Sequence, residues 1–420
     1  MDFFLRYDKW SEPQPVTLPP SKSVQARQLV LAALAGARCR FPEAGRSDDI
    51  AALKKALKKA GKEYEINVEA SGTAFRFMTA YAAMLPGAET LLYGTSYLNR
   101  RPISHLVDAL RSLGADIRYA EHEGAAPLLI RGKEIEGGDV RMSGAVSSQF
   151  VSALLLVAPY MKKGLTLHLT GRNLPSSSYI SMTRHMMHVY GVDTESRRNR
   201  TILVPPGRYR LPPQVHVEDD WSAAAFFYEY AAITSKPVIL CSPGDPSDSW
   251  QGDAAVASLY RCFGVETEVM HGGNVRLVPT GNHVRILDIN MHDCLDLVPA
   301  FAVTAAMLRI PFRISGVANL RHKECNRIEA ISAELLKLGR KIRVSESRIE
   351  WDGNVSAVHG CPVISTSSDH RITMAFSMAA VCFPSIVVCD IHTVKKSYPK
   401  FWHQMSRLGI RYSPSSSDSR

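Results

Sequence analysis

The chain has 420 residues, which is long for one hydrophobic core and favours two domains of about 200 residues each. Its composition, with 45% hydrophobic and 21% charged residues and no apolar run of bilayer-spanning length, excludes a disordered or membrane-embedded chain. The net charge of +10 predicts an anionic partner, and it leaves nucleic acid, an anionic membrane and phosphorylated small molecules open.

The cysteine pattern argues against a secreted, disulfide-linked protein. The chain has eight cysteines, none of them in a CxxC pair, and the first ten residues, MDFFLRYDKW, lack a signal-peptide pattern. We therefore expect reduced thiols in a cytoplasmic protein. The polar residues 413–420 are expected to form a flexible tail.

Helical periodicity and β-rich runs alternate along the whole chain, which favours a mixed α/β or α+β fold. The expected helix starts share a turn followed by a small polar, acidic or basic residue and then an apolar run. They lie near Ser21, Ser47, Ser71, Arg101, Ser147, Ser176, Asp220, Asp253, Asp296, Lys323, Asp369 and Lys396. Taken in pairs, they predict six copies of a two-helix unit, three in each half. Strands are expected at 166–169, 201–204 and 238–241, and a seam between the halves at 216–220.

The first polar motif is PPSKS at positions 19–23, ahead of an apolar helix. Lys22 and Ser23 are expected at the start of this helix, where free backbone N–H groups attract anions. Arg27 follows one turn after Ser23 and lies on the same face. An ordinary serine cap with two surface cations is the alternative interpretation.

A lysine-rich run at 52–62 follows, and its spacing predicts an amphipathic helix with a solvated basic face. Further on, Gly72 would let the backbone approach a ligand closely, and Thr73 is expected to cap the next helix. Arg100 or Arg101 then lies just before another helix. A forked guanidinium at that place suits a carboxylate or a phosphate.

Two later helices start with more polar groups than capping requires. Ser147, Ser148 and Gln149 open a strongly apolar helix, although one capping residue is enough. Ser176 and Tyr179 belong to a similar polar start. The excess of neutral hydrogen-bonding groups favours a ligand at these positions.

In the second half, Asp296 opens an apolar helix, and the sequence alone favours an N-cap with Pro299 in the first turn. Lys323, Glu324 and Arg327 are expected to crowd the first turn of the next amphipathic helix. Cations at a helix N-terminus oppose the macrodipole, so an anionic ligand is expected to compensate for them.

Two more basic helix starts follow, DHR at 369–371 and KKSYP at 395–399. Together the motifs PSKS with Arg27, GT with Arg76, RPI.HLVDALR, SSQF, KE..RI, DHR..M and KK.YP.F resemble those of the 5-enolpyruvylshikimate-3-phosphate synthase family. They run in the family's order from residue 18 to residue 402 and so cover almost the whole chain.

The resemblance implies two similar domains, each built of three βαβαββ units about a pseudo-threefold axis in an inverse α/β barrel. The first domain would comprise residues 21–218, and the second residues 1–20 with 219–412. The active site would lie in the cleft between the domains.

The resemblance also implies a role for each matching residue. Asp296, Glu324 and Lys22 would move protons. Shikimate 3-phosphate would be bound by Lys22, Ser23, Arg27, Ser147, Ser148, Gln149, Ser176, Tyr179, Asp296, Asn319 and Lys323. Phosphoenolpyruvate would be bound by Lys22, Gly72, Arg101, Gln149, Arg327, Arg371 and Lys396.

The implied reaction transfers an enolpyruvyl group from phosphoenolpyruvate to the 5-hydroxyl of shikimate 3-phosphate. It needs a base, an acid and several fixed cations, and it needs no metal and no cofactor. His185 and His188 are accordingly expected on a helix surface rather than as metal ligands. We expect a cytoplasmic monomer that binds these small molecules, with no nucleic acid or membrane as partner. A glycine at position 72 would also leave room for glyphosate.

Two positions depart from the family's pattern. Ala70 stands where the family often has Asn, which removes one side-chain contact near phosphoenolpyruvate. Cys325 and Asn326 stand where a Ser-Asp pair is usual. Neither change affects an expected proton-transfer residue.

Two alternatives belong to other classes. The related UDP-N-acetylglucosamine enolpyruvyl transferases have an Asn after the first lysine and a mobile-loop cysteine. This chain has Ser23 after Lys22, and its only cysteine before residue 241 is Cys39, in an expected strand. A basic, repeat-built nucleic-acid binder would fit the net charge, and its affinity would fall steeply with salt.

Overall fold

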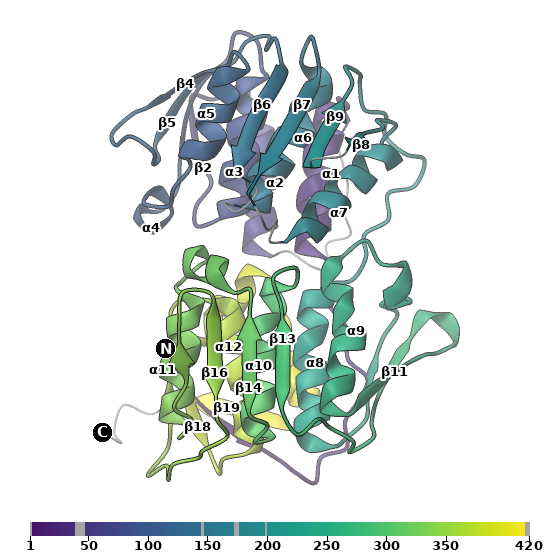
Figure 1. The fold of residues 1–420 in the computed structure, drawn as a ribbon, viewed down its shortest axis with the longest axis vertical. Coiled ribbons are helices and arrows are strands. Elements are labelled where there is room, and N and C mark those ends of the chain that lie inside the picture. The colour runs from purple at the N-terminus through teal and green to yellow at the C-terminus, as the bar shows by residue number, and fades with distance from the viewer. Residues whose placement is uncertain (1, 38–46, 144–146, 172–175, 198–199, 416–420) are drawn as a thin grey trace. The chain divides into compact units, whose positions relative to one another are not determined.

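A computed structural model describes residues 2–37, 47–143, 147–171, 176–197 and 200–415. The chain forms two compact units (Figure 1). The first unit is Ser21–Val217, and the second unit combines Met1–Pro20 with Glu218–Arg420. Cys39, which was expected in a strand, lies outside the described residues.

The first unit contains two four-stranded sheets of the same topology. One has the order β2 (Glu65–Asn67), β3 (Glu89–Tyr93), β5 (Leu128–Arg131), β4 (Asp116–Tyr119). The other has the order β6 (Gly138–Ser143), β7 (Leu165–Thr170), β9 (Thr201–Val204), β8 (Glu195–Arg197). In each sheet the first pair of strands is parallel and the other two pairs are antiparallel. This unit therefore repeats one supersecondary motif.

The second unit repeats the same topology. One sheet has the order β13 (Leu287–Asn290), β14 (Phe312–Ser315), β16 (Arg348–Trp351), β15 (Arg343–Val344). In another, the order is β17 (Val363–Ile364), β18 (Ile386–Val388), β1 (Phe3–Tyr7), β19 (Ile410–Pro414). The third sheet is β10 (Val238–Leu240), β12 (Val275–Pro279), β11 (Val265–Val269), and Val16 forms a parallel bridge to Leu240 at its open edge. Strand β19 extends into residues 413–414, which were expected in the flexible tail.

The helices that matter for the site start where their caps predict. Ser21 caps α1 (Lys22–Leu34), Ser71 caps α3 (Gly72–Ala83), and Ser147 caps α6 (Ser148–Val157). Asp220 caps α8 (Trp221–Thr234), and Asp369 caps α12 (His370–Ser377). Because a short polar side chain satisfies an N–H group of the first turn locally, these starts can be predicted without the fold. Thr73 was expected to cap α3, but it lies inside the helix and Ser71 is the cap.

At four expected helix starts, the α-helix begins later in the sequence or a 3-10 segment is found in its place. Helix α11 (Arg327–Lys337) begins with Arg327 and is capped by Asn326, so Lys323 and Glu324 lie outside it. Lys396 ends a 3-10 segment, Ile391–Lys396, and α13 (Phe401–Arg407) starts later. Asp253 lies in a 3-10 segment, and α5 (Ser104–Ser112) starts three residues after Arg101.

Buried helices form the interior of each unit. In the second unit all ten residues of α10 (Val298–Met307) are buried, as are twelve residues of α8. A helix that is apolar on every side belongs in the middle of a core. By contrast, α2 (Asp48–Lys59) exposes Lys54, Lys55 and Lys58, which confirms the expected basic face.

Among the described helices, none combines the length and the apolarity that crossing a bilayer demands.

Candidate active site

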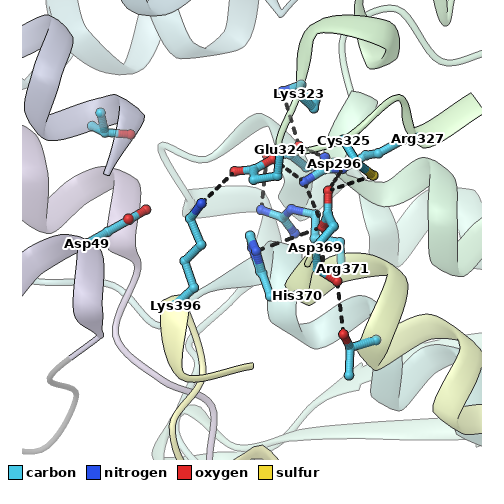
Figure 2. A network of polar contacts seen from close by, with 12 residues as sticks. Asp49, Asp296, Lys323, Glu324, Cys325, Arg327, Asp369, His370, Arg371 and Lys396 are labelled. Atoms are coloured by element: carbon cyan, nitrogen blue, oxygen red, sulfur yellow. Dashed lines mark hydrogen bonds and ion pairs between the residues drawn. The ribbon is translucent and has the colours of Figure 1, made fainter. Parts of the chain in front are cut away.

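The second unit brings together six of the expected site residues: the carboxylates Asp296 and Glu324 and four cations around them (Figure 2). Asp296 lies in a 3-10 segment, Leu295–Leu297, directly before α10, and it is the N-cap residue of neither element. Its carboxylate instead accepts from Arg327 Nη1 at 2.8 Å, Arg371 Nη2 at 3.0 Å and Lys323 Nζ at 3.2 Å. The N-cap interpretation is therefore wrong.

These cations decide the protonation state of Asp296. Burial alone would raise the pKa of this carboxyl group, because a charged group loses its hydration. Arg371, Lys323 and Arg327 outweigh burial and hold the pKa of Asp296 well below its usual range. Without a ligand, Asp296 is an ion-pair partner rather than a base.

Arg327 is the centre of the network. Its side chain is 1% exposed, and its fork donates to Asp296, to Glu324 Oε2 at 2.7 Å and to Asp369 Oδ2 at 2.7 Å. Burial would lower the pKa of the guanidinium, but the three carboxylates, Asp369 first, raise it well above its usual value. Arg327 is therefore a fixed positive charge that aligns Asp296 and Glu324, two of the three expected proton-transfer residues.

The other expected residues of this unit lie around the same centre. Lys396 Nζ lies 3.9 Å from Glu324 Oε1. Asn319 belongs to the 3-10 segment Ala318–His322, directly before Lys323. The Cys325 thiol donates to Asp369 Oδ2 at 3.6 Å, so it takes a hydrogen-bonding role that a serine hydroxyl could also fill.

In the first unit, the start of α1 holds Lys22 and Ser23. Lys22 Nζ forms an ion pair with Asp49 Oδ2 at 2.8 Å, and Asp49 belongs to α2. The side chains of Lys22 and Asp49 are only 13% and 5% exposed. The interpretation of Lys22 as an ordinary surface cation is therefore wrong.

Arg27 is also buried, with 2% of the residue exposed. Its Nε donates to Thr183 Oγ1 at 2.7 Å, and its Nη2 donates to Ser152 Oγ at 3.0 Å. Burial lowers the pKa of this guanidinium to about 10. Tyr179, on α7 (Ser177–Val189), stacks near it with 5.7 Å between Arg27 Cζ and the ring centroid.

The starts of α3 and α6 meet through polar side chains. Gln149 Nε2 donates to Thr73 Oγ1 at 3.2 Å, and Arg76 donates to Gln149 Oε1. Gly72 lies against Arg101, because a Cβ atom built on Gly72 would be 2.8 Å from Arg101 Nη1. These contacts bring together residues that lie far apart in the sequence.

The remaining expected residues lie at helix starts. Ser147 accepts from Gln149 N at 3.3 Å, and Ser148 is the first residue of α6. Ser176 precedes α7 in the left-handed region, with φ of 59°, and it is buried. His185 and His188 are exposed on α7, as expected.

Sequence reasoning missed several residues that hold the site. Asp49 and Asp369 are buried partners of site cations, and Ser152 and Thr183 are buried partners of Arg27. Asp369 carried one usable signal, since it lies two residues before Arg371 at a basic helix start. Ser152 and Thr183 lie inside helices, where nothing in the sequence sets them apart.

Comparison with known proteins decides the family. The family model for EPSP synthase (3-phosphoshikimate 1-carboxyvinyltransferase) matches residues 59–405. The chain belongs to the EPSP synthase family. A 3-phosphoshikimate 1-carboxyvinyltransferase of Bacteroides fragilis (strain YCH46) is 40% identical over 396 residues, covering 94% of this chain and 95% of the relative. One from Photobacterium damsela subsp. piscicida is 32% identical, with 94% and 96% covered.

Solved structures show the same fold. The EPSP synthase of Acinetobacter baumannii superposes with a TM-score of 0.74 at 22% identity, over 99% of this chain and all of that one. The enolpyruvyl transferase NikO of Streptomyces tendae gives a TM-score of 0.75 at 16% identity, with 99% of both chains covered. The expected family, the two-domain α/β fold and the transferase class are thereby confirmed.

Proposed function

We propose that this chain transfers the enolpyruvyl group of phosphoenolpyruvate to the 5-hydroxyl of shikimate 3-phosphate and releases phosphate. The observation that carries the proposal is the network of the second unit. There four cations, Lys323, Arg327, Arg371 and Lys396, surround Asp296 and Glu324. Two highly charged anionic substrates need such fixed cations, and the transfer needs carboxylates beside them.

We assign the substrate contacts as the family resemblance implies. Phosphoenolpyruvate is held by Lys22, Gly72, Arg101, Gln149, Arg327, Arg371 and Lys396. Shikimate 3-phosphate is held by Lys22, Ser23, Arg27, Ser147, Ser148, Gln149, Ser176, Tyr179, Asp296, Asn319 and Lys323. The position of both substrates between the two units stays a prediction.

The bond changes balance without a cofactor. The 5-hydroxyl oxygen attacks C2 of phosphoenolpyruvate, and the electron pair of the double bond takes a proton at the C3 methylene. In the resulting tetrahedral intermediate, C3 then loses a proton, the double bond re-forms, and the bond from C2 to the phosphate oxygen breaks. Asp296, Glu324 and Lys22 share these proton transfers.

Substrate binding itself would turn Asp296 into a base. The phosphate and carboxylate groups of the substrates compete with Asp296 for Arg371, Arg327 and Lys323, whose charges now lower its pKa. As those cations turn to the substrates, the pKa of Asp296 rises towards its usual range, and the carboxylate can accept the proton of the 5-hydroxyl. Base strength thus develops only when the substrates are bound.

We further propose that the protein works as a cytoplasmic monomer, without a metal and without nucleic acid or a membrane as partner. The buried cations Arg327 and Arg371 support small phosphorylated molecules as the expected anionic partner. Light scattering of the purified protein, with and without substrates, tests the oligomeric state.

The deciding experiment measures phosphate release from phosphoenolpyruvate in the presence of EDTA. Shikimate 3-phosphate and UDP-N-acetylglucosamine are compared as acceptors. We expect release only with shikimate 3-phosphate, and loss of release in Asp296→Asn. Asp288→Asn is the matched control, because Asp288 pairs with Arg313 in the same unit but its side chain is 64% exposed.

Two results would contradict the proposal. Release with only the nucleotide sugar would assign the chain to the related transferases. Full activity in the Asp296→Asn variant would remove this carboxylate from the proton transfers.

A further inference from the structure

Arg27 is a buried cation that has only neutral partners. Four of its five N–H groups meet acceptors: Thr183 Oγ1, Ser152 Oγ, Ser23 O at 2.9 Å and Tyr179 O at 3.4 Å. Within the part of the chain that the structure describes, no carboxylate pairs with Arg27. A buried charge without a counter-ion is costly to maintain, and an anionic ligand compensates for that cost.

The two hydroxyl groups beside Arg27 form a closed hydrogen-bond arrangement. Thr183 Oγ1 donates its single proton to Tyr179 O at 2.7 Å. It therefore accepts in its contact with Ser152 Oγ at 2.9 Å, and Ser152 is the donor there. Both oxygens then present lone pairs to Arg27, one to Nε and one to Nη2.

This arrangement fixes the orientation of the guanidinium plane. Ser152 lies on α6, Thr183 on α7 and Arg27 on α1, and both hydroxyl-bearing residues are 0% exposed. The rings of Phe77 and Tyr179 lie near Arg27, each with its centroid 5.7 Å from Cζ. Polar contacts thus hold one edge of the fork while aromatic rings limit its movement.

We propose that Ser152 and Thr183 are positioning residues, which hold the Arg27 fork in the orientation that binds the shikimate 3-phosphate anion. The inference rests on the proposed function, because it takes Arg27 as a contact of that substrate. Neutral hydroxyl partners suit this role, because they orient the guanidinium and leave its charge to the ligand. A carboxylate in their place would neutralise Arg27 and compete with the substrate.

The test measures the dissociation constant of shikimate 3-phosphate by calorimetry for Thr183→Val, Ser152→Ala and Thr183→Ser. We expect Thr183→Val and Ser152→Ala each to raise this constant about tenfold or more, because each removes an acceptor from a charged donor. Thr183→Ser keeps the hydroxyl and should stay within about twofold. In turnover at saturating shikimate 3-phosphate, the KM for phosphoenolpyruvate should change by less than about threefold.

Thr79→Val is the matched control. Thr79 is also 0% exposed, but its hydroxyl donates only to Phe75 O of its own helix, at 2.8 Å. This variant should lose some thermal stability and keep the affinity for shikimate 3-phosphate. It separates a general loss of packing from the loss of an Arg27 partner.

A double-mutant cycle with Arg27→Ala shows whether the effect passes through Arg27. If Thr183 acts by orienting Arg27, then Thr183→Val changes the affinity less than twofold once Arg27 is alanine. An undiminished effect in that background, or an unchanged affinity in folded Thr183→Val, would overturn the inference.

Should Thr183→Val fail to fold, Ser152→Ala, which removes one oxygen atom, decides alone. If the unmodified protein neither binds shikimate 3-phosphate nor turns it over, the proposed function fails instead.

Discussion

At the scale of single residues, the ion-pair network of the second unit depends on Arg327, whose guanidinium joins three carboxylates. Arg327 holds Asp296, Glu324 and Asp369 with distances of 2.7–2.8 Å for the three ion pairs. A lysine has one nitrogen and no fork, so it cannot maintain these three contacts in the same geometry. The identity of this cation therefore matters as much as its charge.

We predict that Arg327→Lys lowers kcat/KM for phosphoenolpyruvate by about 100-fold or more. Breaking part of a buried ion-pair network should also cost roughly 3–5 kcal/mol of unfolding free energy. Steady-state phosphate release and urea denaturation provide the two measurements. Arg313→Lys is the control, since Arg313 pairs with Glu350 and Asp288 but its side chain is 54% exposed, and its effect should stay below about 1 kcal/mol. Equal effects of the two substitutions would contradict a special role for Arg327.

A second prediction at this scale concerns Gly72 and glyphosate. In Gly72→Ala the new methyl group would lie 2.8 Å from Arg101 Nη1 and 3.2 Å from Arg76 Nη1, so a guanidinium must move. The guanidinium is the far end of a flexible side chain, so it can shift at little cost in stability. We expect glyphosate to inhibit the unmodified protein in competition with phosphoenolpyruvate. The substitution should raise the inhibition constant at least about fivefold and also raise the KM for phosphoenolpyruvate.

Gly207→Ala is the control for that prediction, because the nearest atom to its new methyl group is 3.9 Å away. It should leave both constants unchanged. An unmodified enzyme that glyphosate does not inhibit, or a Gly72→Ala variant with unchanged inhibition, would contradict the proposed position of Gly72.

At the scale of secondary-structure elements, helix caps could be predicted from the sequence, whereas contacts between residues remote in the sequence could not. Ser21, Ser71 and Asp220 cap helices through bonds to N–H groups three residues later, so the sequence alone predicts them. Lys323 and Lys396 also looked like helix starts. Both lie outside α-helices. The side chain of Lys323 pairs with Asp296, and the side chain of Lys396 pairs with Glu324, and both carboxylates are remote in the sequence.

For the site, the sequence likewise predicted residues but not their contacts. Family motifs identified Asp296 and Lys22, but the sequence did not show that Lys22 pairs with Asp49. Asp296 and Asp369 both resemble capping residues in sequence. Only Asp369 is one, and Asp296 is turned towards three cations because the fold brings α11 and α12 to it.

Helix α8 carries a prediction about pH and stability. Glu229 lies within this helix, it is 0% exposed, and neither carboxyl oxygen has a hydrogen-bond partner among the described residues. Burial first, and Cys382 second, raise its pKa well above its usual value of 4.5, so the folded protein keeps it neutral. The unfolded chain ionises Glu229 above that value. Stability contributed by the neutral group is thus complete below pH 4.5 and falls as the pH rises towards the folded pKa.

Accordingly, Glu229→Gln should gain stability relative to the unmodified protein as the pH increases. The difference should grow by up to about 1.4 kcal/mol per pH unit above pH 5, until the folded pKa is reached. Urea denaturation of both proteins between pH 5 and pH 8 measures it. A difference that is constant with pH would show that Glu229 is ionised in the folded state.

At the scale of the whole molecule, the net charge of +10 has two kinds of contributor. Lysines of α2 are exposed to solvent, whereas the side chains of Arg327 and Arg371 are 1% and 8% exposed. Salt screens exposed charges over about 8 Å at physiological ionic strength, and it screens buried ones much less. An enzyme that uses the buried cations and a nucleic-acid binder that uses the exposed ones therefore differ in their response to salt.

We predict that the KM for phosphoenolpyruvate rises by less than about tenfold when KCl increases from about 0.05 M to about 0.5 M. A protein that neutralised six or more phosphates of DNA would lose at least about 1000-fold in affinity over a smaller change in salt. Duplex DNA in excess should not inhibit phosphate release, because the side chains of Arg327 and Arg371 are almost fully buried. Replacing Lys54, Lys55 and Lys58 by serine should leave turnover unchanged at both salt concentrations. Inhibition by DNA that this triple substitution relieves would show instead that the exposed basic face of α2 has a nucleic-acid partner.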